Sequence, residues 1–594
     1  MKSLKATYIF LVCVCLGFTS CEFLDKEPYQ ITPENSFRNE QEAYSFLTGI
    51  YSTLLQSSFY GNSYLFLVGG DYLGHYGGSG RTPYKSGLIC NNANSSDADV
   101  TALWSTLYTG INRANLFLEN IDAVPEIKDE TRLQYKSEAR FLRAFFYFTL
   151  VECWGDVPFT TTSTQDSDEK DLPRTDKQQI YDFIASEMSG CANDLKSASE
   201  LSYRPGRISK STAWGILARV YLFRAGEHYR DNVSANPELQ KEYYRQASRY
   251  AQMVLKEGHT LAPYYWSYFI DICSDQYNTT GNESIWEVEF AGNRSNDVRS
   301  EGRIGNIIGL NCWDYSSQAN VLGKEDPGFS YGFIYATPKL LELYEENGDI
   351  NRCNWSIAPF TYTRVDNSQP VSGRYFEYNK LAEVKKQYYD ESFNYGEGND
   401  VLKIGDREKT KNASDNNRNR VCAKYRREYE NTRSTTIVKK SKNDTSINFP
   451  ILRYSDVLLM IAEAENELNE KPNQLAYECI NQVRERARRN KAGMEATPAD
   501  LQGLDKDEFR KAVKDERAME LCFEYTRRFD LIRWGEYTER MNELAPVAQA
   551  GGSWTQGSAY VYTYFQISSA YNYFPIPASE IASNSQITSN NPGW

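Results

Sequence analysis

EARFLRAFFYFTL, residues 138–150, is the stretch that most strongly indicates the fold class. At 3.6 residues per turn, Phe141, Phe145 and Phe148 share one face of a helix, and further apolar side chains lie beside them. Such a helix needs neighbours on nearly every side, so it belongs in the core of a helical protein. Only a narrow polar stripe interrupts it, formed by Lys136, Arg140 and Arg143.

Helical periodicity extends through much of the remaining chain, whereas strand-like alternation is confined to 284–290 and 561–566. Alanines recur where paired helices would cross, which is typical of tetratricopeptide-like repeats. The sequence therefore predicts a mainly α, superhelical scaffold with a few short strands. The predicted helices are 101–121, 131–153, 176–196 behind a Thr175 cap, 209–226, 240–257, 338–347, 453–469, 473–488 and 505–526.

Composition excludes several classes of protein. The 594-residue chain carries a formal charge of −13, which argues against nucleic-acid binding, since such proteins present a basic surface. Three histidines leave little material for imidazole catalysis or a multi-histidine metal site. The sequence has no zinc-protease, nucleophile-elbow, Walker or Rossmann motif in a fitting context, so it predicts neither a metal nor a cofactor.

The first residues read as a targeting segment. Lys2 and Lys5 precede an apolar run at 8–18, which is shorter than the roughly 20 residues that span a bilayer. Cys21 follows small residues, as in bacterial lipoprotein signals, so we expect residues 1–20 to be removed and Cys21 to be acylated. The alternatives are a buried cysteine behind an ordinary cleavage site, or a core helix.

Two glutamates are the strongest candidates for catalysis. Glu516 and Glu520 lie one helical turn apart, which could imitate the paired carboxylates of a glycoside hydrolase. The arginines between 517 and 533 would instead keep both carboxylates ionised, and such a hydrolase needs one protonated acid. A structural ion network is therefore the favoured interpretation.

Aromatic residues outside any regular period are candidates for ligand binding. Aromatics make up 14% of the chain, and long segments at 259–337 and 349–448 combine them with Gly, Asn and Ser. Sugars present flat C–H faces to rings and hydroxyl edges to Asp, Asn or Arg. The candidates are Tyr72, Tyr76 and Arg81 in one glycine-rich segment, and Trp313, Asp314 and Tyr315 in another.

A basic stretch at 401–445 stands out in this acidic chain, with 13 Lys and Arg against 6 Asp and Glu. We expect a solvated loop or hairpin there. The alternative is contact with an acidic partner or a membrane surface.

Several stretches together resemble the SusD/RagB family of nutrient-uptake outer-membrane lipoproteins from Bacteroidetes. They occur in family order along the whole chain. They are CEFLDKEP from Cys21, SEARFLRAFFYFTLVECWGDVP at 137–158, RISKSTAWGILARVYLF at 207–223, NESIWEVEF at 282–290, FPILRYSDVLLMIAEAENEL at 449–468, INQVRERA at 480–487, KDERAMELCFEYTRRFDLIRW at 514–534, FPIPASEI at 574–581 and the final NNPGW.

The resemblance implies a right-handed α-superhelix with a loop-rich ligand face and no catalytic residues. It also implies a surface-exposed lipoprotein, held in the outer membrane by its lipid alone. Such a protein binds glycans and delivers them, as a hinged lid, to a SusC-like TonB-dependent transporter. Peptide or another nutrient is the alternative ligand. We expect a helical region at 21–260, a loop-rich region at 261–448 and a second helical region at 449–594, forming one compact unit.

Overall fold

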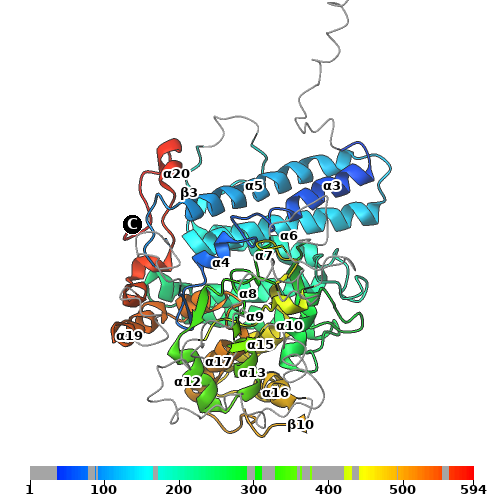
Figure 1. Cartoon of the computed structure of the whole chain (residues 1–594). Helices are drawn as coiled ribbons and strands as arrows, with labels where there is room; N and C mark the ends of the chain where they lie inside the picture. The colour runs from blue at the N-terminus through cyan, green and yellow to red at the C-terminus, as the bar shows by residue number, and fades with distance from the viewer. Residues whose placement is uncertain are drawn as a thin grey trace, which may run out of the picture.

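The fold was analysed in a computed structural model (Figure 1). It describes residues 37–77, 87, 91–164, 171–290, 302–310, 328–357, 361–363, 375–377, 420–430, 441–490, 493–550 and 561–594. Helices dominate these residues, and the strands are short. The prediction of a mainly α fold built on tetratricopeptide-like helix pairs is confirmed.

Helix α6 (Asp129–Trp154) is buried along most of its length, as its sequence predicts. Phe145 packs edge-on against Trp286 at 4.7 Å, and Phe148 against Phe223 at 6.2 Å. Each buried phenylalanine contributes on the order of 2–3 kcal/mol from apolar area removed from water. The polar stripe of this helix forms ion pairs, since Arg140 and Arg143 both pair with Glu187, at 2.9 and 2.7 Å.

Several helices that follow one another in sequence pack against each other. α6 lies between α5 and α7, α8 packs on α9, and α9 in turn packs on α15. In Figure 1, α3, α5 and α6 form a layer on top of the later helices. The bounds of this first group are α3 (Glu40–Tyr51), α4 (Ser63–Leu67), α5 (Ala98–Asn120), α7 (Lys177–Ala192), α8 (Lys210–Asp231), α9 (Pro237–Leu255) and α10 (Tyr265–Ser274).

A second group of helices follows the loop-rich middle of the chain. The predicted helix 505–526 ends earlier than expected, at Leu521, because Phe523 and Tyr525 adopt positive φ angles. A separate short helix begins at Arg527. Gly226 of α8 touches the backbone of Arg533 in that helix, a closeness that a side chain would prevent. The bounds are α12 (Pro338–Asn347), α13 (Ile350–Ser356), α15 (Tyr454–Leu468), α16 (Gln474–Arg488), α17 (Lys506–Leu521), α18 (Arg527–Arg533), α19 (Tyr537–Gln549) and α20 (Ala578–Ser583).

The strands form two-stranded sheets. β4 (Ser284–Val288), which the sequence predicts, pairs antiparallel with β8 (Phe449–Arg453), and β1 (Gly74–Tyr76) pairs with β5 (Ile334–Ala336). The remaining pairs are β2 (Val157–Pro158) with β3 (Arg174–Thr175), β6 (Thr361–Thr363) with β7 (Tyr375–Glu377), and β9 (Arg489–Asn490) with β10 (Gly493–Met494).

The prediction of a strand at 561–566 is wrong. The structure has a 3₁₀ helix at Val561–Phe565, whose buried residues are Val561, Tyr564 and Phe565. Burial thus recurs after three and four residues rather than after two, and the mixed aromatic sequence hid this period.

Predicted helix ends were accurate to about one turn, and capping explains the differences. α7 is capped by Asp176, whose carboxylate accepts from Gln178 N at 2.7 Å, and not by Thr175. α12 begins after Thr337 and ends at Gly348, as predicted, but the Thr337 hydroxyl donates to Tyr72 O instead of capping the helix.

The C-terminal segment packs against the end of α6. Phe574 N donates to Cys153 O at 2.8 Å, and the Trp154 indole donates to Pro575 O at 2.9 Å. The Asn591 amide closes the arrangement by donating to Trp154 O at 2.9 Å. The last helical turn of α6 is therefore completed by residues from the far end of the sequence.

Candidate functional site

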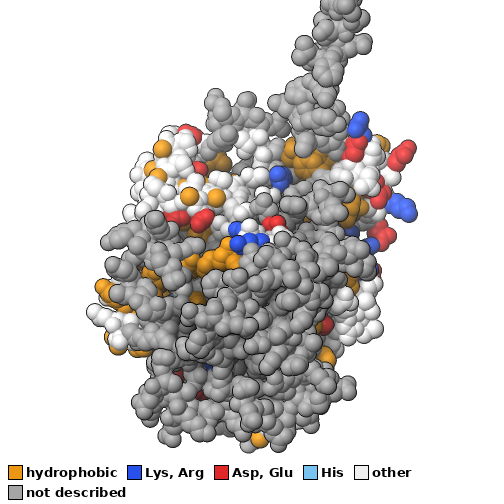
Figure 2. All heavy atoms as spheres, in the orientation of Figure 1, with side chains coloured by type: hydrophobic (Ala, Val, Ile, Leu, Met, Phe, Trp, Pro, Cys, Tyr) orange, Lys and Arg blue, Asp and Glu red, His pale blue; other side chains and the backbone are white. Residues whose placement is uncertain are grey.

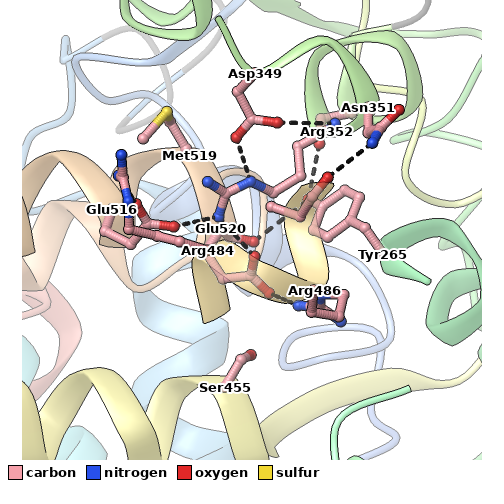
Figure 3. Close-up of polar contacts among 12 residues, drawn as sticks. Tyr265, Asp349, Asn351, Arg352, Ser455, Arg484, Arg486, Glu516, Met519 and Glu520 are labelled. Carbon is pink, nitrogen blue, oxygen red and sulfur yellow. Dashed lines mark hydrogen bonds and ion pairs between the residues drawn. The ribbon is translucent and has the colours of Figure 1, made fainter. Parts of the chain in front are cut away.

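Glu516 and Glu520 lie in a buried ion network and have no exposed surface (Figure 3). The Arg352 guanidinium bridges them at 2.6 and 2.9 Å from the two carboxylates. Arg484 also pairs with Glu516, at 2.7 Å, while Arg453 and Arg486 pair with Glu520. The favoured interpretation as a structural ion network is confirmed.

The partners differ from those expected, because the arginines next to these glutamates in sequence point elsewhere. Arg517 pairs with Asp456 and Asp530, and Arg533 pairs with Glu463. Burial acts to raise the pKa of Glu520, but Arg486, Arg453 and Arg352 together outweigh it and hold this pKa well below its usual range. A carboxylate held ionised, and sealed from solvent, cannot serve as the acid of a glycoside hydrolase.

The expectation of a solvated basic loop is wrong for the described residues 420–427. Lys424 is buried, 2.7 Å from Glu524 and 2.8 Å from Glu520 O. The Arg426 guanidinium lies over the Trp355 ring at 3.9 Å from its centroid. These cations are thus buried against carboxylates and aromatic faces from distant parts of the chain. The local sequence does not indicate such partners, so the burial could not be predicted from it.

Glu152 is a carboxyl with the protonation behaviour that a hydrolase would need, but its surroundings exclude a substrate. Burial raises its pKa to about 8, against the opposing effect of Arg219 and Arg230. It lines a cavity of about 50 Å³, which is room for a few water molecules and not for a sugar ring.

Replacing Glu152 with glutamine is expected to change how stability depends on pH. The folded carboxyl keeps its proton up to about pH 8, whereas the unfolded chain releases it near pH 4.3, so the wild type loses stability as the pH rises between these values. The Glu152→Gln protein lacks this loss, so its free energy of unfolding relative to the wild type should increase by about 4 kcal/mol from pH 5 to pH 9. Denaturant unfolding at both pH values measures it. A constant difference would contradict the assignment.

Of the predicted ligand residues, the structure describes Tyr72 and Tyr76. Tyr72 is half-buried against the core, and Tyr76 lies in β1 with 1% of its surface exposed. Arg81, Trp313, Asp314 and Tyr315 lie outside the described residues, and the set as a whole stays a prediction.

The described ends of both predicted segments are held together by backbone hydrogen bonds. Gly77, which precedes the segment with Arg81, donates to Phe333 O at 2.9 Å. Phe333 N in turn donates to Ile307 O at 2.9 Å, in the stretch that leads toward Trp313. The fold therefore joins two positions that are more than 200 residues apart in the chain.

An aromatic row runs along this junction, formed by Phe329, Tyr331, Phe333 and Tyr335. The rings of Phe329 and Tyr331 meet edge to face at 4.6 Å, and those of Tyr331 and Phe333 stack at 4.7 Å with an interplanar angle of 8°. Phe333 continues to Tyr76 at 5.4 Å. Tyr331 is 37% exposed and the other three rings are half-buried, so the row reaches solvent mainly through Tyr331.

The row was missed by sequence reasoning, although a signal for it exists. In GFSYGFIYA, from Gly328 to Ala336, every second residue is aromatic. A period of two places these rings on one side of an extended chain, and the last part of this stretch is β5. The alternation was obscured by the glycines that flank and interrupt it.

The described surface mixes charges of both signs. Figure 2 shows acidic and basic side chains side by side at the edge of the helical layer near α3. Among the described residues, none of the helices is both long and apolar enough to cross a bilayer, and no group of His, Cys, Asp and Glu could hold a metal ion.

Two family models match this chain. One, described as "SusD family", matches residues 282–594, and the other, "Starch-binding associating with outer membrane", matches residues 22–222. Among characterised relatives, "SusD-like protein P25" of Formosa agariphila is 27% identical over 90% of either chain. "Starch-binding protein SusD" of Bacteroides thetaiotaomicron is 23% identical over 81% of this chain and 76% of its own length.

Solved structures agree on the fold. A SusD homologue from Bacteroides thetaiotaomicron superposes with a TM-score of 0.73 and 26% identity, covering 95% of this chain and 99% of the homologue. A "Laminarin binding SusD-like protein" superposes with a TM-score of 0.62 and 22% identity, covering 94% and 100% of the two chains.

Proposed function

Because this chain belongs to the SusD family, we propose that it binds a glycan at the aromatic row. Rings that reach solvent suit the C–H faces of sugar units, since they bury apolar surface while the sugar hydroxyls stay hydrated at the edges. The exposed Tyr331 ring, stacked on the half-buried Phe333, is the observation that supports this site most strongly.

The two predicted loop segments complete the proposed site. Arg81 and the Trp313–Tyr315 stretch follow directly on the residues that flank the row, and they supply the hydrogen-bonding groups and the further ring that sugar recognition uses. Binding without catalysis fits the described carboxylates, because those considered for hydrolysis are enclosed in the core.

We also propose where in the cell the protein acts. The chain would be anchored in the outer membrane through a lipid on Cys21, exposed at the surface, and would hand glycans to a SusC-like TonB-dependent transporter. Two observations support this location. The apolar run at 8–18 is followed by Cys21, and the family model that matches residues 22–222 is described as associating with the outer membrane. One acyl chain binds membranes only marginally, so contact with the transporter should also retain the protein.

The proposed site is tested by replacing Tyr331 with alanine. The change removes the exposed ring of the row and should weaken glycan binding by roughly 1–3 kcal/mol, as for a central aromatic anchor, without unfolding the protein. Isothermal titration against oligosaccharides and peptides measures the affinity and identifies the ligand class. Trp313→Ala should have an effect of the same size.

Tyr229 provides a matched control, because it is 50% exposed and lies on α8. Tyr229→Ala should bind as the wild type does. If Tyr331→Ala also binds normally, the site is elsewhere. If peptides bind and no oligosaccharide does, the ligand class is wrong while the family assignment stands.

A further inference from the structure

An open cavity of about 770 Å³ lies between α5, the segment 158–164 and α20. Figure 1 shows α20 next to β3 and the start of α5. The Trp104 indole of α5 donates to the Glu580 carboxylate of α20 at 3.2 Å, which fixes the two walls against each other. The volume lies in the range typical of small-ligand sites, and none of the lining residues belongs to the aromatic row.

Two rings belong to the apolar part of the lining, together with Ile111, Pro158 and Leu172. Trp104 and Tyr108 lie 5.1 Å apart, centroid to centroid, and tilted by 49°. The Tyr108 hydroxyl donates to Pro158 O at 2.7 Å, so this ring is held in place before any ligand arrives. A fixed ring at the edge of a cavity offers apolar contact at little cost in side-chain entropy.

Neutral hydrogen-bonding groups also line the cavity from α5. Ser105, Thr109 and Asn112 follow one another at helical spacing along one face of α5. Asn112 Oδ1 accepts from Thr164 N at 2.8 Å, and within the described residues its NH₂ group has no partner. It is therefore available to a ligand acceptor.

The charged groups of the lining are already engaged within the protein. Asp171 accepts from the Ser585 hydroxyl at 2.6 Å, and Glu580 accepts from Asn584 as well as from Trp104. The Arg113 guanidinium donates to Gly49 O at 3.0 Å. Trp104 is only 4% exposed, so what remains for a ligand is hydroxyls, the Asn112 amide and the half-buried Tyr108 ring. These groups suit a neutral polyhydroxylated molecule better than an anion or a cation.

We propose that this cavity is a second binding site, for a neutral oligosaccharide, separate from the aromatic row. The site adds a second point of attachment for the same class of ligand. A polysaccharide long enough to reach both sites would then be held more tightly than by either one, through a raised effective concentration at the second site.

The test fills the cavity with a bulky side chain. Ser105→Phe places a ring in the opening from an exposed position, and Ser186→Phe, an equally exposed helical serine on α7, is the matched control. The probes are laminarihexaose and maltohexaose, titrated calorimetrically into the wild type, into Tyr331→Ala, and into Tyr331→Ala combined with either phenylalanine change. Asn112→Ala removes a hydrogen-bonding group without adding bulk.

The expected result is that Tyr331→Ala retains one class of sites for at least one probe. Ser105→Phe should weaken this residual binding at least tenfold and Asn112→Ala about threefold, while Ser186→Phe leaves it unchanged. Loss of all binding in Tyr331→Ala alone, or residual binding that Ser105→Phe does not alter, would overturn the second site and leave the proposed function intact. Binding lost with Ser105→Phe but unaffected by Tyr331→Ala would support the cavity and contradict the aromatic row. A wild type that binds neither hexasaccharide overturns this inference.

Discussion

Glu520→Gln is expected to destabilise the protein by about 3–5 kcal/mol. The change keeps the shape of the side chain but removes the charge shared by Arg352, Arg453 and Arg486, which are buried and would be left without compensation. Equilibrium unfolding in urea, followed by circular dichroism, measures the effect. The same charge predicts a loss of stability in acid, because a carboxyl with a lowered pKa stabilises the fold above its unfolded pKa and ceases to do so as the pH falls.

Glu485→Gln is the matched control for this experiment. Glu485 pairs with Arg489 at i,i+4 on the surface of α16, where both side chains are more than 40% exposed. Such a pair contributes about 0.3–0.5 kcal/mol, so the same chemical change should be nearly silent. Equal effects of the two substitutions would show that burial of the network contributes nothing to its strength.

Cys21→Ser is expected to remove the lipid anchor and so to weaken attachment to the membrane. Serine cannot form the thioether through which the proposed lipid is added, so the full-length protein should move from the outer-membrane fraction to the soluble fraction, or keep its leader. Mass spectrometry of the protein and fractionation of the producing cells measure both outcomes.

Cys15→Ser is the control, since Cys15 lies in the part of the leader that is expected to be removed. It should leave both the mass of the mature protein and its location unchanged. A Cys21→Ser protein that stays in the outer membrane with an unaltered mass would contradict the lipid anchor while leaving glycan binding untouched.

The helices could be predicted from the sequence because the patterns that indicate them are local. The apolar period of α6 and the proline and glycine around α12 depend on neighbours within a few residues. The 3₁₀ helix at Val561–Phe565 was missed because Tyr and Phe suit either period, and the tertiary packing decides which side chains are buried.

Only part of the buried ion network could be predicted from the sequence. That Glu516 and Glu520 serve structure could be argued from nearby arginines, but their real partners come from positions 352, 453, 484 and 486. The burial of Lys424 follows from Glu524, a hundred residues further on. Charge balance over such separations is set by topology, which no local pattern encodes. The same holds for the aromatic row, whose alternation gains meaning only where β5 meets β1.

The docking of the C-terminal segment on α6 has a consequence for the order of events during biosynthesis. The Trp154 indole donates to Pro575 O, and Trp154 O accepts from the Asn591 amide. These two partners lie 421 and 437 positions further along the chain. Closing so large a loop is slow, and a ribosome must have made nearly the whole polypeptide before it can happen. A nascent chain therefore cannot complete this part of the fold before its last residues are made, which suits the export that the proposed leader would require.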